Sequence, residues 1–437
     1  MTRLQELRAR IESREARIGV MGLGYVGLPL ALEFAKAGFR VAGFDLDAEK
    51  VRILSGGGSY IGDVPADEVK APVAAGRLTA HTDFTGLAAA DVIHVCVPTP
   101  LTKTKDPDVS FIVRAVEEIR KRLRSGQLIV LGSTTYPGTT HDLFVPLLEE
   151  TGLRCGADFA VCFGPERIDP ANKRFHVRQV PKVVGGETPL CAELGRVVFE
   201  AVFDQVVPVS STQAAEMVKL LENTFRAINI GLVNEVALMC NRLGLDVWEV
   251  IDAAATKPYG FMKFQPGPGL GGHCIPVDPT YLSWKMKALN FTARFIELAT
   301  DVNGHMPEHV VTTIGDLLNE ERTAVNGARV LLLGVAYKAD VSDVRESPAL
   351  DILRLLDEKG ADVRYHDPYV PELALEGRTW KSVEATDEEL AAADLVVILT
   401  DHSALDYARV VARAQRVYDT RNATRNVREG REKIRKL

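Results

Sequence analysis

The loop from Gly269 to Pro279 holds the residues best suited to chemistry. It reads Gly-Leu-Gly-Gly-His-Cys-Ile-Pro-Val-Asp-Pro, with Cys274 followed four residues later by the carboxylate of Asp278. Glycines let the backbone approach a ligand closely, and the prolines stiffen the exit from the loop. A thiol with an acid–base group nearby can form a covalent bond to a substrate. The competing interpretation is a glycine turn around a small buried cysteine, since most free cysteines are buried.

Polar clusters follow three predicted strands, at residues 91–97, 127–132 and 159–163. All three clusters come at the carboxyl ends of strands, where doubly wound sheets bind their ligands. Any one cluster could be an ordinary loop, but three in succession favour a binding site. The candidate residues in them are Pro98, Thr99, Thr134, Glu166 and Arg167.

A long helix is predicted over residues 212–243, and a capping box that begins at Ser210 starts it. Lys219, Asn223 and Arg226 are spaced by four and then three residues, so they share one face of this helix. A solvated polar stripe is the ordinary explanation of such a face. The apolar residues around this stripe favour a helix between two domains with a functional face.

The elements that position these residues begin with a dinucleotide fingerprint. A predicted strand at 18–21 leads into Gly22-Leu23-Gly24-Tyr25-Val26-Gly27, and a helix at 28–37 and a strand at 40–44 follow. The first glycine permits the tight turn, the second admits the pyrophosphate, and the third lets the helix pack on the strand. Asp45, 18 residues past the third glycine, should accept hydrogen bonds from ribose hydroxyls and repel a 2′-phosphate, which favours NAD over NADP. A purely structural glycine turn is the minority interpretation here.

A second alternating α/β sheet is predicted to start near Arg329. Its strands are expected at 329–337, 362–366, 394–400 and 416–418, with a helix at 347–359, and another long helix at 293–320 precedes the sheet. The first turn of this sheet lacks the dinucleotide fingerprint, although a different nucleotide could bind there. Lys338, Asp340 and Arg345 lie in that turn and in the loop after it.

The composition is that of an ordinary globular protein. The chain has 437 residues, of which 46% are hydrophobic and 25% charged, and this length predicts two or three domains. A net charge of -7 argues against a nucleic-acid partner. The six cysteines form no C-x-x-C pair, which is typical of reduced cytosolic thiols and not of a disulfide framework or a metal site. Neither a signal peptide nor a membrane span is predicted, so we expect a cytoplasmic protein.

Several motifs, in this order, make the chain resemble the UDP-glucose/GDP-mannose dehydrogenase family over nearly its whole length. They are the segments 22–29 (GLGYVGLP), 97–100 (VPTP), 165–166 (PE), 215–219 (AEMVK) with Asn223, 234–235 (NE), 271–278 (GGHCIPVD) and 345–348 (RESP). The resemblance implies an α/β fold in which two Rossmann-like doubly wound domains are joined by a long central helix. It divides the chain into an NAD-binding domain at 1–209, a helical domain with the cysteine loop at 210–324, and a UDP-sugar-binding domain at 325–437. It further implies a homodimer or higher homo-oligomer.

The resemblance also implies an activity, the four-electron oxidation of a sugar C6 alcohol to a carboxylate with two NAD⁺. Cys274 would attack the intermediate aldehyde, and the resulting thiohemiacetal would be oxidised to a thioester that water cleaves. Lys219 and Asn223 would stabilise an alkoxide, Glu166 would orient or activate the water, and Asp278 would be a second carboxylate of the site. The non-catalytic alternatives are a solvated loop carboxylate for Glu166 and a turn residue for Asp278. Packing or loop geometry is the favoured role of His273.

Further residues are assigned to binding by the same resemblance. The cofactor-binding residues are Gly22, Gly24, Tyr25, Val26, Gly27, Asp45, Pro98, Thr99, Thr134 and Arg345. The substrate-binding residues are Glu166, Arg167, Lys219, Asn223, Arg226, Gly271 and Lys338.

The choice of sugar is predicted from a few positions. UDP-glucose enzymes of the family usually carry a lysine where this chain has Val277. The segments 133–140, 264–269, 272–279 and 399–403 are similar to the branch that acts on N-acetylated UDP-hexosamines. UDP-N-acetylglucosamine is therefore the predicted substrate, with UDP-N-acetylmannosamine and UDP-glucose as alternatives.

Two other classes of protein stay open. A two-electron dehydrogenase of the 6-phosphogluconate type would share much of this layout but would not need Cys274, and it would release one NADH per substrate. A non-catalytic nucleotide-sugar sensor would be expected to lose Cys274, Lys219 or Glu166, and all three are present.

Overall fold

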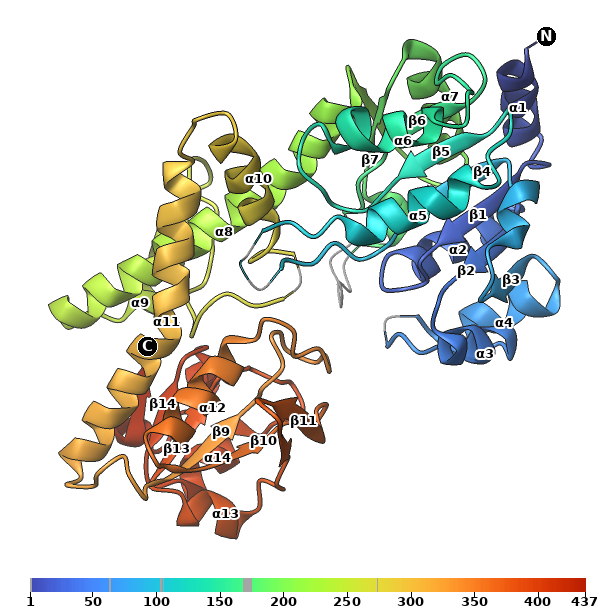
Figure 1. The fold of residues 1–437 in the computed structure, drawn as a ribbon. Coiled ribbons are helices and arrows are strands. Elements are labelled where there is room, and N and C mark those ends of the chain that lie inside the picture. The colour runs from blue at the N-terminus through green and yellow to red at the C-terminus, as the bar shows by residue number, and fades with distance from the viewer. Residues whose placement is uncertain (1, 63, 103, 105, 168–174, 273) are drawn as a thin grey trace. The chain divides into compact units, whose positions relative to one another are not determined.

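The computed structural model describes residues 2–62, 64–102, 104, 106–167, 175–272 and 274–437. Its contacts divide the chain into two compact units, and each unit collects two stretches of sequence. Unit 1 consists of Met1–Glu222 and Thr280–Phe291, and unit 2 consists of Asn223–Pro279 and Thr292–Leu437 (Figure 1). Each unit contains its own mostly parallel sheet covered by helices, which confirms the predicted fold class.

The sheet of unit 1 has the strand order β3-β2-β1-β4-β5-β6-β7-β8 in the described part of the chain. Neighbouring strands are parallel except β6 and β7, which pair in antiparallel fashion. The strands are β1 Arg17–Met21, β2 Arg40–Phe44, β3 Leu78–His81, β4 Val92–Val95, β5 Leu128–Leu131, β6 Ala160–Phe163, β7 Lys182–Gly186 and β8 Val206–Val209. The first six follow the order of a dinucleotide-binding sheet, whose switch point lies between β1 and β4.

Helices cover both faces of this sheet. Alternate residues of its strands point to opposite faces, and both sets are buried. In β5, Leu128 and Val130 join the core that includes Phe34 and Phe199, whereas Ile129 and Leu131 join the other core. The helices are α1 Arg3–Glu12, α2 Gly27–Lys36, α3 Ala48–Ser55, α4 Ala66–Ala74, α5 Ser110–Arg120, α6 Val145–Glu149 and α7 Pro189–Glu200. A parallel sheet buried on both faces requires continuous apolar strands, which is the pattern read from the sequence.

The sheet of unit 2 has the order β10-β9-β13-β14-β15, and all of its neighbours are parallel. Numbered from β9, this is the flavodoxin-like order 2-1-3-4-5, with its switch point between β9 and β13. Its strands are β9 Arg329–Leu333, β10 Asp362–His366, β13 Leu395–Ile398, β14 Val417–Asp419 and β15 Ile434–Lys436, and β11 Glu372–Leu375 pairs with β12 Arg378–Lys381 as a separate hairpin. The helices α12 Pro348–Glu358, α13 Asp387–Ala392 and α14 Tyr407–Arg413 accompany the sheet.

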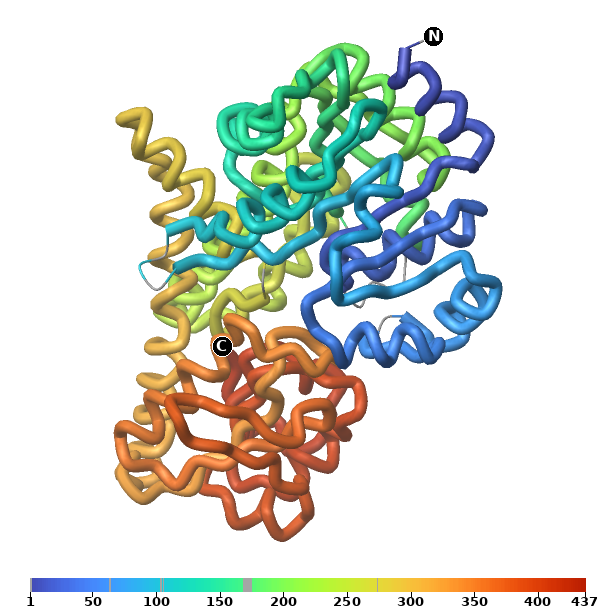
Figure 2. The backbone as a smooth tube through the Cα atoms, turned by 45° about the vertical axis from the view of Figure 1, so that its right-hand side comes forward, coloured from blue at the N-terminus to red at the C-terminus, as the bar shows by residue number. Residues whose placement is uncertain are grey.

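Two long helices, α8 Thr212–Leu243 and α11 Arg294–Glu320, have almost the predicted bounds. Helix α8 begins in unit 1 and ends in unit 2, and the shorter α9 Val247–Ala254 and α10 Asp278–Lys287 complete the helical segment. The second half of α11 packs on α12, where Ile314 and Ile352 share one core (Figures 1 and 2).

Two details of the sequence prediction are wrong. The Oγ atom of Ser211, and not that of Ser210, accepts the capping hydrogen bond at the start of α8, from the Ala214 N–H at 3.1 Å. The strand predicted at 329–337 ends at Leu333, because Gly334 has a φ of 86° and turns the chain directly against Thr400. A Cβ atom on Gly334 would lie 2.4 Å from the Cβ of Thr400.

Candidate active site

The glycine loop after β1 has room for a ligand at its middle glycine. A Cβ atom on Gly22, whose φ is 87°, would lie 2.4 Å from the carbonyl oxygen of Cys96. One on Gly27 would lie 1.8 Å from the carbonyl oxygen of Gly22, so both positions exclude any side chain. A Cβ on Gly24 would meet no protein atom within 4 Å. The loop therefore fits a dinucleotide pyrophosphate, which needs close approach at that glycine and at the start of α2.

Asp45 is held against this loop at the end of β2. Its Oδ2 accepts the Leu23 N–H at 2.8 Å, and its Oδ1 accepts the Asp47 N–H at 3.0 Å. Tyr60 holds the other backbone polar group of Leu23, since its hydroxyl donates to the Leu23 carbonyl at 2.6 Å. Burial, helped by the charge of Asp45, raises the pKa of the Tyr60 hydroxyl and keeps it protonated. Tyr60 could not be selected from the sequence, because an isolated tyrosine in a loop has no recognisable spacing.

The polar clusters after β4 and β5 lie at the same edge as the glycine loop. Strands β1, β4 and β5 are parallel neighbours, so Pro98, Thr99 and Thr134 follow strands that end side by side. The hydroxyl of Ser133 donates to the Val97 carbonyl at 2.8 Å and joins the two strand ends. As predicted, these clusters share one edge of the sheet.

Helix α8 fixes the loop after β5 through the buried side chain of Glu216. Its carboxylate accepts the backbone N–H groups of Gly138 and Thr140 and the Thr140 hydroxyl, the last at 2.6 Å. Burial raises the pKa of the Glu216 carboxyl to about 7 in spite of these three donors. The loop that carries Thr134 is thus anchored to the helix that carries Lys219.

After β6, Glu166 and Arg167 are both engaged in unit 1. The Glu166 carboxylate accepts the Arg167 N–H at 2.8 Å and the Lys182 ammonium at 3.2 Å. The Arg167 guanidinium forms an ion pair with Glu222 of α8 and donates to the Pro181 carbonyl at 2.7 Å. Lys182 was missed by sequence reasoning, because a lysine that opens a strand usually points to solvent.

On α8, Lys219 and Asn223 are buried, whereas Arg226 is exposed. Lys219 belongs to unit 1, and Asn223 and Arg226 belong to unit 2. The Asn223 amide donates directly to the Asp278 carboxylate within unit 2. Two residues that were selected from separate motifs are therefore in contact.

The cysteine loop of unit 2 brings Cys274 to the start of α10. The Cys274 carbonyl accepts the N–H groups of Val277 at 3.1 Å and Asp278 at 2.8 Å, so a tight turn separates the thiol from the carboxylate. The Cys274 side chain is half-buried. Gly272 has a φ of 92° and donates its N–H to the Arg345 carbonyl at 3.1 Å. His273 lies outside the described residues.

Gly271 explains why the cysteine loop is rich in glycine. A Cβ atom on Gly271 would lie 2.8 Å from the Cβ of Tyr337 and 3.0 Å from the Glu346 carbonyl oxygen. The loop therefore packs on the segment after β9, which includes Lys338 and Arg345. The predicted cofactor residue Arg345 forms a two-pronged ion pair with Asp343 in the same segment.

A pair of buried asparagines holds the other end of this loop. The Asn234 amide of α8 donates to the Asn303 amide oxygen of α11 at 2.8 Å and accepts the Gly267 N–H at 2.9 Å. Asn303 in turn donates to the Ala227 carbonyl at 3.1 Å. The two helices and the loop are thus fixed to one another by amide groups with paired donors and acceptors.

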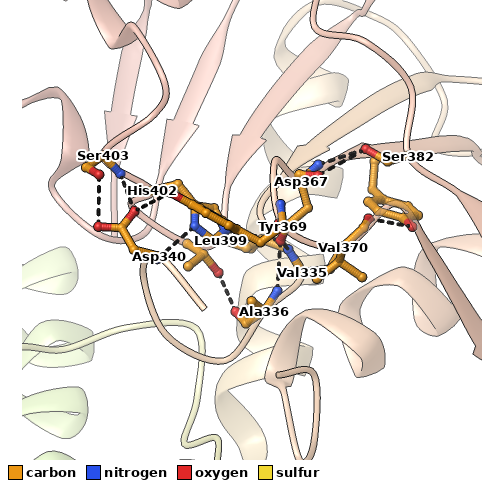
Figure 3. Close-up of polar contacts among 12 residues, drawn as sticks. Val335, Ala336, Asp340, Asp367, Tyr369, Val370, Ser382, Leu399, His402 and Ser403 are labelled. Atoms are coloured by element: carbon orange, nitrogen blue, oxygen red, sulfur yellow. Dashed lines mark hydrogen bonds and ion pairs between the residues drawn. The ribbon is translucent and has the colours of Figure 1, made fainter. Parts of the chain in front are cut away.

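In unit 2, polar groups that follow the carboxyl ends of the strands form a cluster at the switch point of the sheet (Figure 3). Asp367 accepts the Val335 and Ala336 N–H groups and the Nε2–H of His402, the last at 3.1 Å. His402 accepts the Asp340 N–H at its Nδ1, at 3.0 Å. Burial opposes ionisation of Asp367, but these donors hold the pKa of its carboxyl below the usual range. The cluster fixes the loop that carries Lys338.

Three further observations limit the chemistry that is possible. The described residues contain no group of three or more histidine, cysteine, aspartate or glutamate side chains arranged to hold a metal ion. The six cysteines are free thiols. In the part of the chain that the structure describes, every helix is too short or too polar to cross a bilayer.

Comparison with known proteins decides the family. Three models of the UDP-glucose/GDP-mannose dehydrogenase family match in succession, the NAD binding domain at residues 16–203, the central domain at 213–305 and the UDP binding domain at 331–426. The chain belongs to this family. It is an NAD-dependent UDP-sugar dehydrogenase, which confirms the predicted enzyme class and cofactor.

Curated relatives of this dehydrogenase include enzymes for two different sugars. The chain is 39% identical to a UDP-N-acetyl-D-glucosamine 6-dehydrogenase of Pseudomonas aeruginosa, over 82% of this chain and 84% of the relative. It is 35% identical to a UDP-N-acetyl-D-mannosamine dehydrogenase of Pyrococcus horikoshii, over 88% and 89% of the two chains.

Solved structures agree with this assignment to the family. A UDP-D-ManNAc dehydrogenase from Pyrococcus horikoshii matches with a TM-score of 0.86 at 32% identity, over 94% of this chain and 96% of that chain. The UDP-N-acetyl-mannosamine dehydrogenase Cap5O from Staphylococcus aureus matches with a TM-score of 0.82 at 31% identity, over 97% and 98% of the two chains.

Proposed function

We propose that this dehydrogenase oxidises the C6 hydroxyl of a UDP-N-acetylhexosamine, UDP-N-acetylglucosamine in the first place, to the carboxylate. The observation that carries the proposal is the cysteine loop, in which Cys274 stands one tight turn from Asp278 and Asp278 accepts a hydrogen bond from Asn223. A two-electron dehydrogenase has no use for such a thiol. The 39% identity to an enzyme named for UDP-N-acetyl-D-glucosamine favours that sugar.

UDP-N-acetylmannosamine is the second candidate substrate. The relative of 35% identity and both solved structures cited above are named for that sugar. The two sugars differ only in the configuration at C2, so the same thiol and carboxylates would serve either. UDP-glucose remains a weaker alternative because Val277 stands where UDP-glucose enzymes usually carry a lysine.

The proposed reaction has two oxidations and one hydrolysis. NAD⁺, held by the loop from Gly22 to Gly27, would supply the hydride acceptor for both oxidations. Lys219 and Asn223 stabilise the negative charge on the C6 oxygen by a cation and an amide donor. Cys274 adds to the aldehyde, and because a free thiol has a pKa of about 8.5, a nearby positive charge speeds this addition by favouring the thiolate. Glu166 orients the water that cleaves the thioester, and Asp278 holds Asn223 in place.

The remaining binding roles follow the two sheets. We assign the pyrophosphate to the loop from Gly22 to Gly27 and the adenosine ribose to Asp45. Further cofactor contacts are assigned to Tyr25, Val26, Pro98, Thr99, Thr134 and Arg345, and further substrate contacts to Glu166, Arg167, Lys219, Arg226, Gly271 and Lys338. In functional terms the chain divides into a cofactor part at 1–209, a helical part at 210–324 and a UDP-sugar part at 325–437.

A second copy of the chain is the proposed partner. Phe225, Leu232 and Met239 repeat every seven residues along α8 and are 44%, 54% and 51% exposed. Leu243 of α8 and Phe295 of α11 are still more exposed. A row of large apolar side chains on paired helices is typical of an interface between subunits. Leu232→Glu should convert the oligomer to monomers in light scattering, whereas Lys359→Glu, on an exposed turn, should not.

The cysteines support a reducing compartment, and we propose the cytoplasm. All six are free thiols, although Cys155 and Cys191 have sulfur atoms only 3.9 Å apart. Disulfides persist in oxidising compartments and are rare in the cytosol.

The decisive test of the activity is the stoichiometry of NADH release with a panel of UDP-sugars. Two NADH per molecule of UDP-N-acetylglucosamine, with a uronic acid as the product, is the expected result. One NADH per sugar would indicate a two-electron dehydrogenase, and no NADH with any sugar would indicate a sensor. UDP-N-acetylmannosamine and UDP-glucose in the same panel test the choice of sugar.

A further inference from the structure

Lys182 is unusual because it is a lysine inside a hydrophobic core. It opens β7 and is only 3% exposed. Its ammonium lies 5.0 Å from the ring centroid of Phe199 and 5.2 Å from that of Phe203. A cation over aromatic rings recovers only part of the free energy that is lost when a lysine leaves water. A buried lysine therefore needs an anionic partner.

That partner is the carboxylate of Glu166, which accepts a hydrogen bond from Lys182 at 3.2 Å. The other oxygen of Glu166 accepts the backbone N–H of Arg167 at 2.8 Å. Each carboxylate oxygen thus accepts a hydrogen bond from a donor in unit 1. Two donors from different directions restrict the rotation of a glutamate side chain, which is otherwise among the most flexible.

A second contact joins the same two segments of chain. The Arg167 guanidinium donates to the carbonyl of Pro181, the residue before Lys182, at 2.7 Å. Its Nε donates to Glu222 of α8 at 3.1 Å. The segment after β6 and the start of β7 are therefore bound together through both a side chain and a backbone group, and the position of the ammonium relative to Glu166 is fixed by the fold.

The other titratable groups around Lys182 are held neutral or are paired elsewhere. Burial lowers the pKa of His94 to about 3, and the charge of Lys182 adds to this effect. Burial raises the pKa of the Cys96 thiol to about 12 and raises that of Cys162 as well. Glu222 forms its ion pair with Arg167. Among the described groups, Glu166 is thus the anion that faces this ammonium.

We propose that Lys182 is a positioning residue for the hydrolytic half of the reaction, which keeps Glu166 oriented to take a proton from water. The inference rests on the function proposed above. In this step the water oxygen adds to the acyl carbon while one of its protons passes to Glu166. The C–S bond then breaks, Cys274 leaves as the thiolate, and the new carboxylic acid loses its proton to give the uronate. Lys182 itself touches neither water nor sugar in this scheme.

The test compares Lys182→Met with Lys182→Arg and with the wild-type enzyme. Methionine has a similar length and suits the aromatic surroundings, but it carries no charge. We expect the initial burst of NADH to persist while steady-state turnover falls about 10- to 100-fold. This is less than the roughly 10²- to 10⁴-fold loss that is typical of removing an acid–base group itself, because Glu166 is still present. Acylated enzyme should accumulate in intact-protein mass spectra, and the KM for the UDP-sugar should stay within about twofold. Lys182→Arg, which keeps the charge, should recover part of the turnover.

The comparison of burst and steady-state rates separates positioning from simple stabilisation of the fold. A variant that is merely less well folded loses both rates together, whereas a misplaced Glu166 slows only the turnover that follows the burst. The matched control is Lys36→Met, which removes an exposed lysine that is paired with Glu33 and Glu68 in the same unit and should leave both rates unchanged.

A double-mutant cycle keeps the inference falsifiable even if Lys182→Met is poorly folded. In a Glu166→Gln background, exchange of Lys182 for arginine should change kcat no further, because its effect passes through the carboxylate. An equal loss of burst and steady-state rate in Lys182→Met would overturn the role of Lys182. If instead the wild-type enzyme releases a single NADH per sugar, the proposed function itself fails.

Discussion

Backbone hydrogen bonds hold Cys274 in its place. Its carbonyl accepts two N–H groups at the start of α10, and the neighbouring Gly272 is bound to the Arg345 carbonyl. The thiol is therefore presented by a turn that is closed by backbone groups. Serine keeps these backbone groups, so exchange of sulfur for oxygen should change the chemistry more than the fold of the loop.

Substitution of Cys274 by serine tests the covalent step. We expect Cys274→Ser to abolish net formation of the uronic acid while binding of NAD and of the UDP-sugar stays nearly unchanged. An oxygen ester, if it forms, hydrolyses slowly, so acylated protein should be sought by mass spectrometry. A serine variant with near wild-type turnover would rule out the thioester mechanism.

Asp45 has a structural partner in addition to its proposed ligand. Asp45→Ala should weaken NAD binding by about 1–3 kcal/mol, because hydrogen bonds from the ribose to a charged acceptor are lost. It should also relax discrimination against NADP, since the repelling charge is gone. Because Asp45 also accepts the Leu23 N–H, Asp45→Asn is the matched variant that keeps an acceptor for the loop. Unchanged preference for NAD in both variants would show that Asp45 does not bind the ribose.

At the scale of elements, the hydrogen bonds of Asn234 and Asn303 join α8, α11 and the cysteine loop. Gly231 allows the two helices to approach, since a Cβ there would lie 3.3 Å from Ala299. Asn234 and Asn303 then fill the remaining space with paired amide groups. The loop that presents Cys274 is thus tied to rigid helices at Gly267.

Asn234→Ala should lower the free energy of unfolding by about 1–3 kcal/mol, because it leaves the amide of Asn303 and the N–H of Gly267 without their partner. It should also reduce kcat, since the cysteine loop loses its anchor. Chemical denaturation and steady-state kinetics measure the two effects. Asn229→Ala is the control, as the half-buried Asn229 donates its amide N–H to the Phe225 carbonyl within its own helix. Equal effects of the two substitutions would show that Asn234 does not anchor the cysteine loop.

The elements that could be predicted are those with a strong local pattern. The bounds of β2, β10 and α8 agree with their apolar runs and helical periodicity, and the glycine fingerprint indicated β1, α2 and Asp45. The contact between Asn223 and Asp278 could not be predicted, because it joins residues 55 positions apart that only the fold brings together. Lys182 was missed for the same reason. Strand β7 runs antiparallel to β6, and this brings the ammonium of Lys182 to Glu166. No local sequence pattern indicates that a strand is antiparallel to its neighbour.

At the scale of the whole molecule, the two sheets have different strand orders but use the same edge. Each has its switch point at the carboxyl ends of parallel strands, between β1 and β4 in one and between β9 and β13 in the other. Crevices of this kind bind ligands in doubly wound folds. Two nucleotides, the cofactor and the UDP-sugar, are thus matched by two sheets, one in the NAD binding domain and one in the UDP binding domain. We expect discrimination between sugars to come from loops.

Substrate choice should accordingly resist change at a single position. We predict that the wild-type enzyme oxidises UDP-N-acetylglucosamine with a kcat/KM at least ~10-fold above that for UDP-glucose, since a missing acetamido group costs roughly 1–3 kcal/mol in a fitted pocket. The UDP group is common to both sugars and cannot discriminate. Val277→Lys alone should not invert the preference. Steady-state kinetics with both sugars measure this, and UDP-glucose as the better wild-type substrate would contradict the choice of sugar.

Unit 1 is discontinuous along the chain, which matters while the protein is being made. Its last segment, Thr280–Phe291, follows the segment Asn223–Pro279 of unit 2 and contains Tyr281, whose hydroxyl donates to the Pro100 carbonyl. Ribosomes add about 5–20 residues per second, so the earlier strands emerge on the order of seconds before this segment does. During that interval the nascent unit lacks part of its own surface. Chaperones that bind apolar chain segments therefore have their best opportunity in that interval, before translation has passed Phe291.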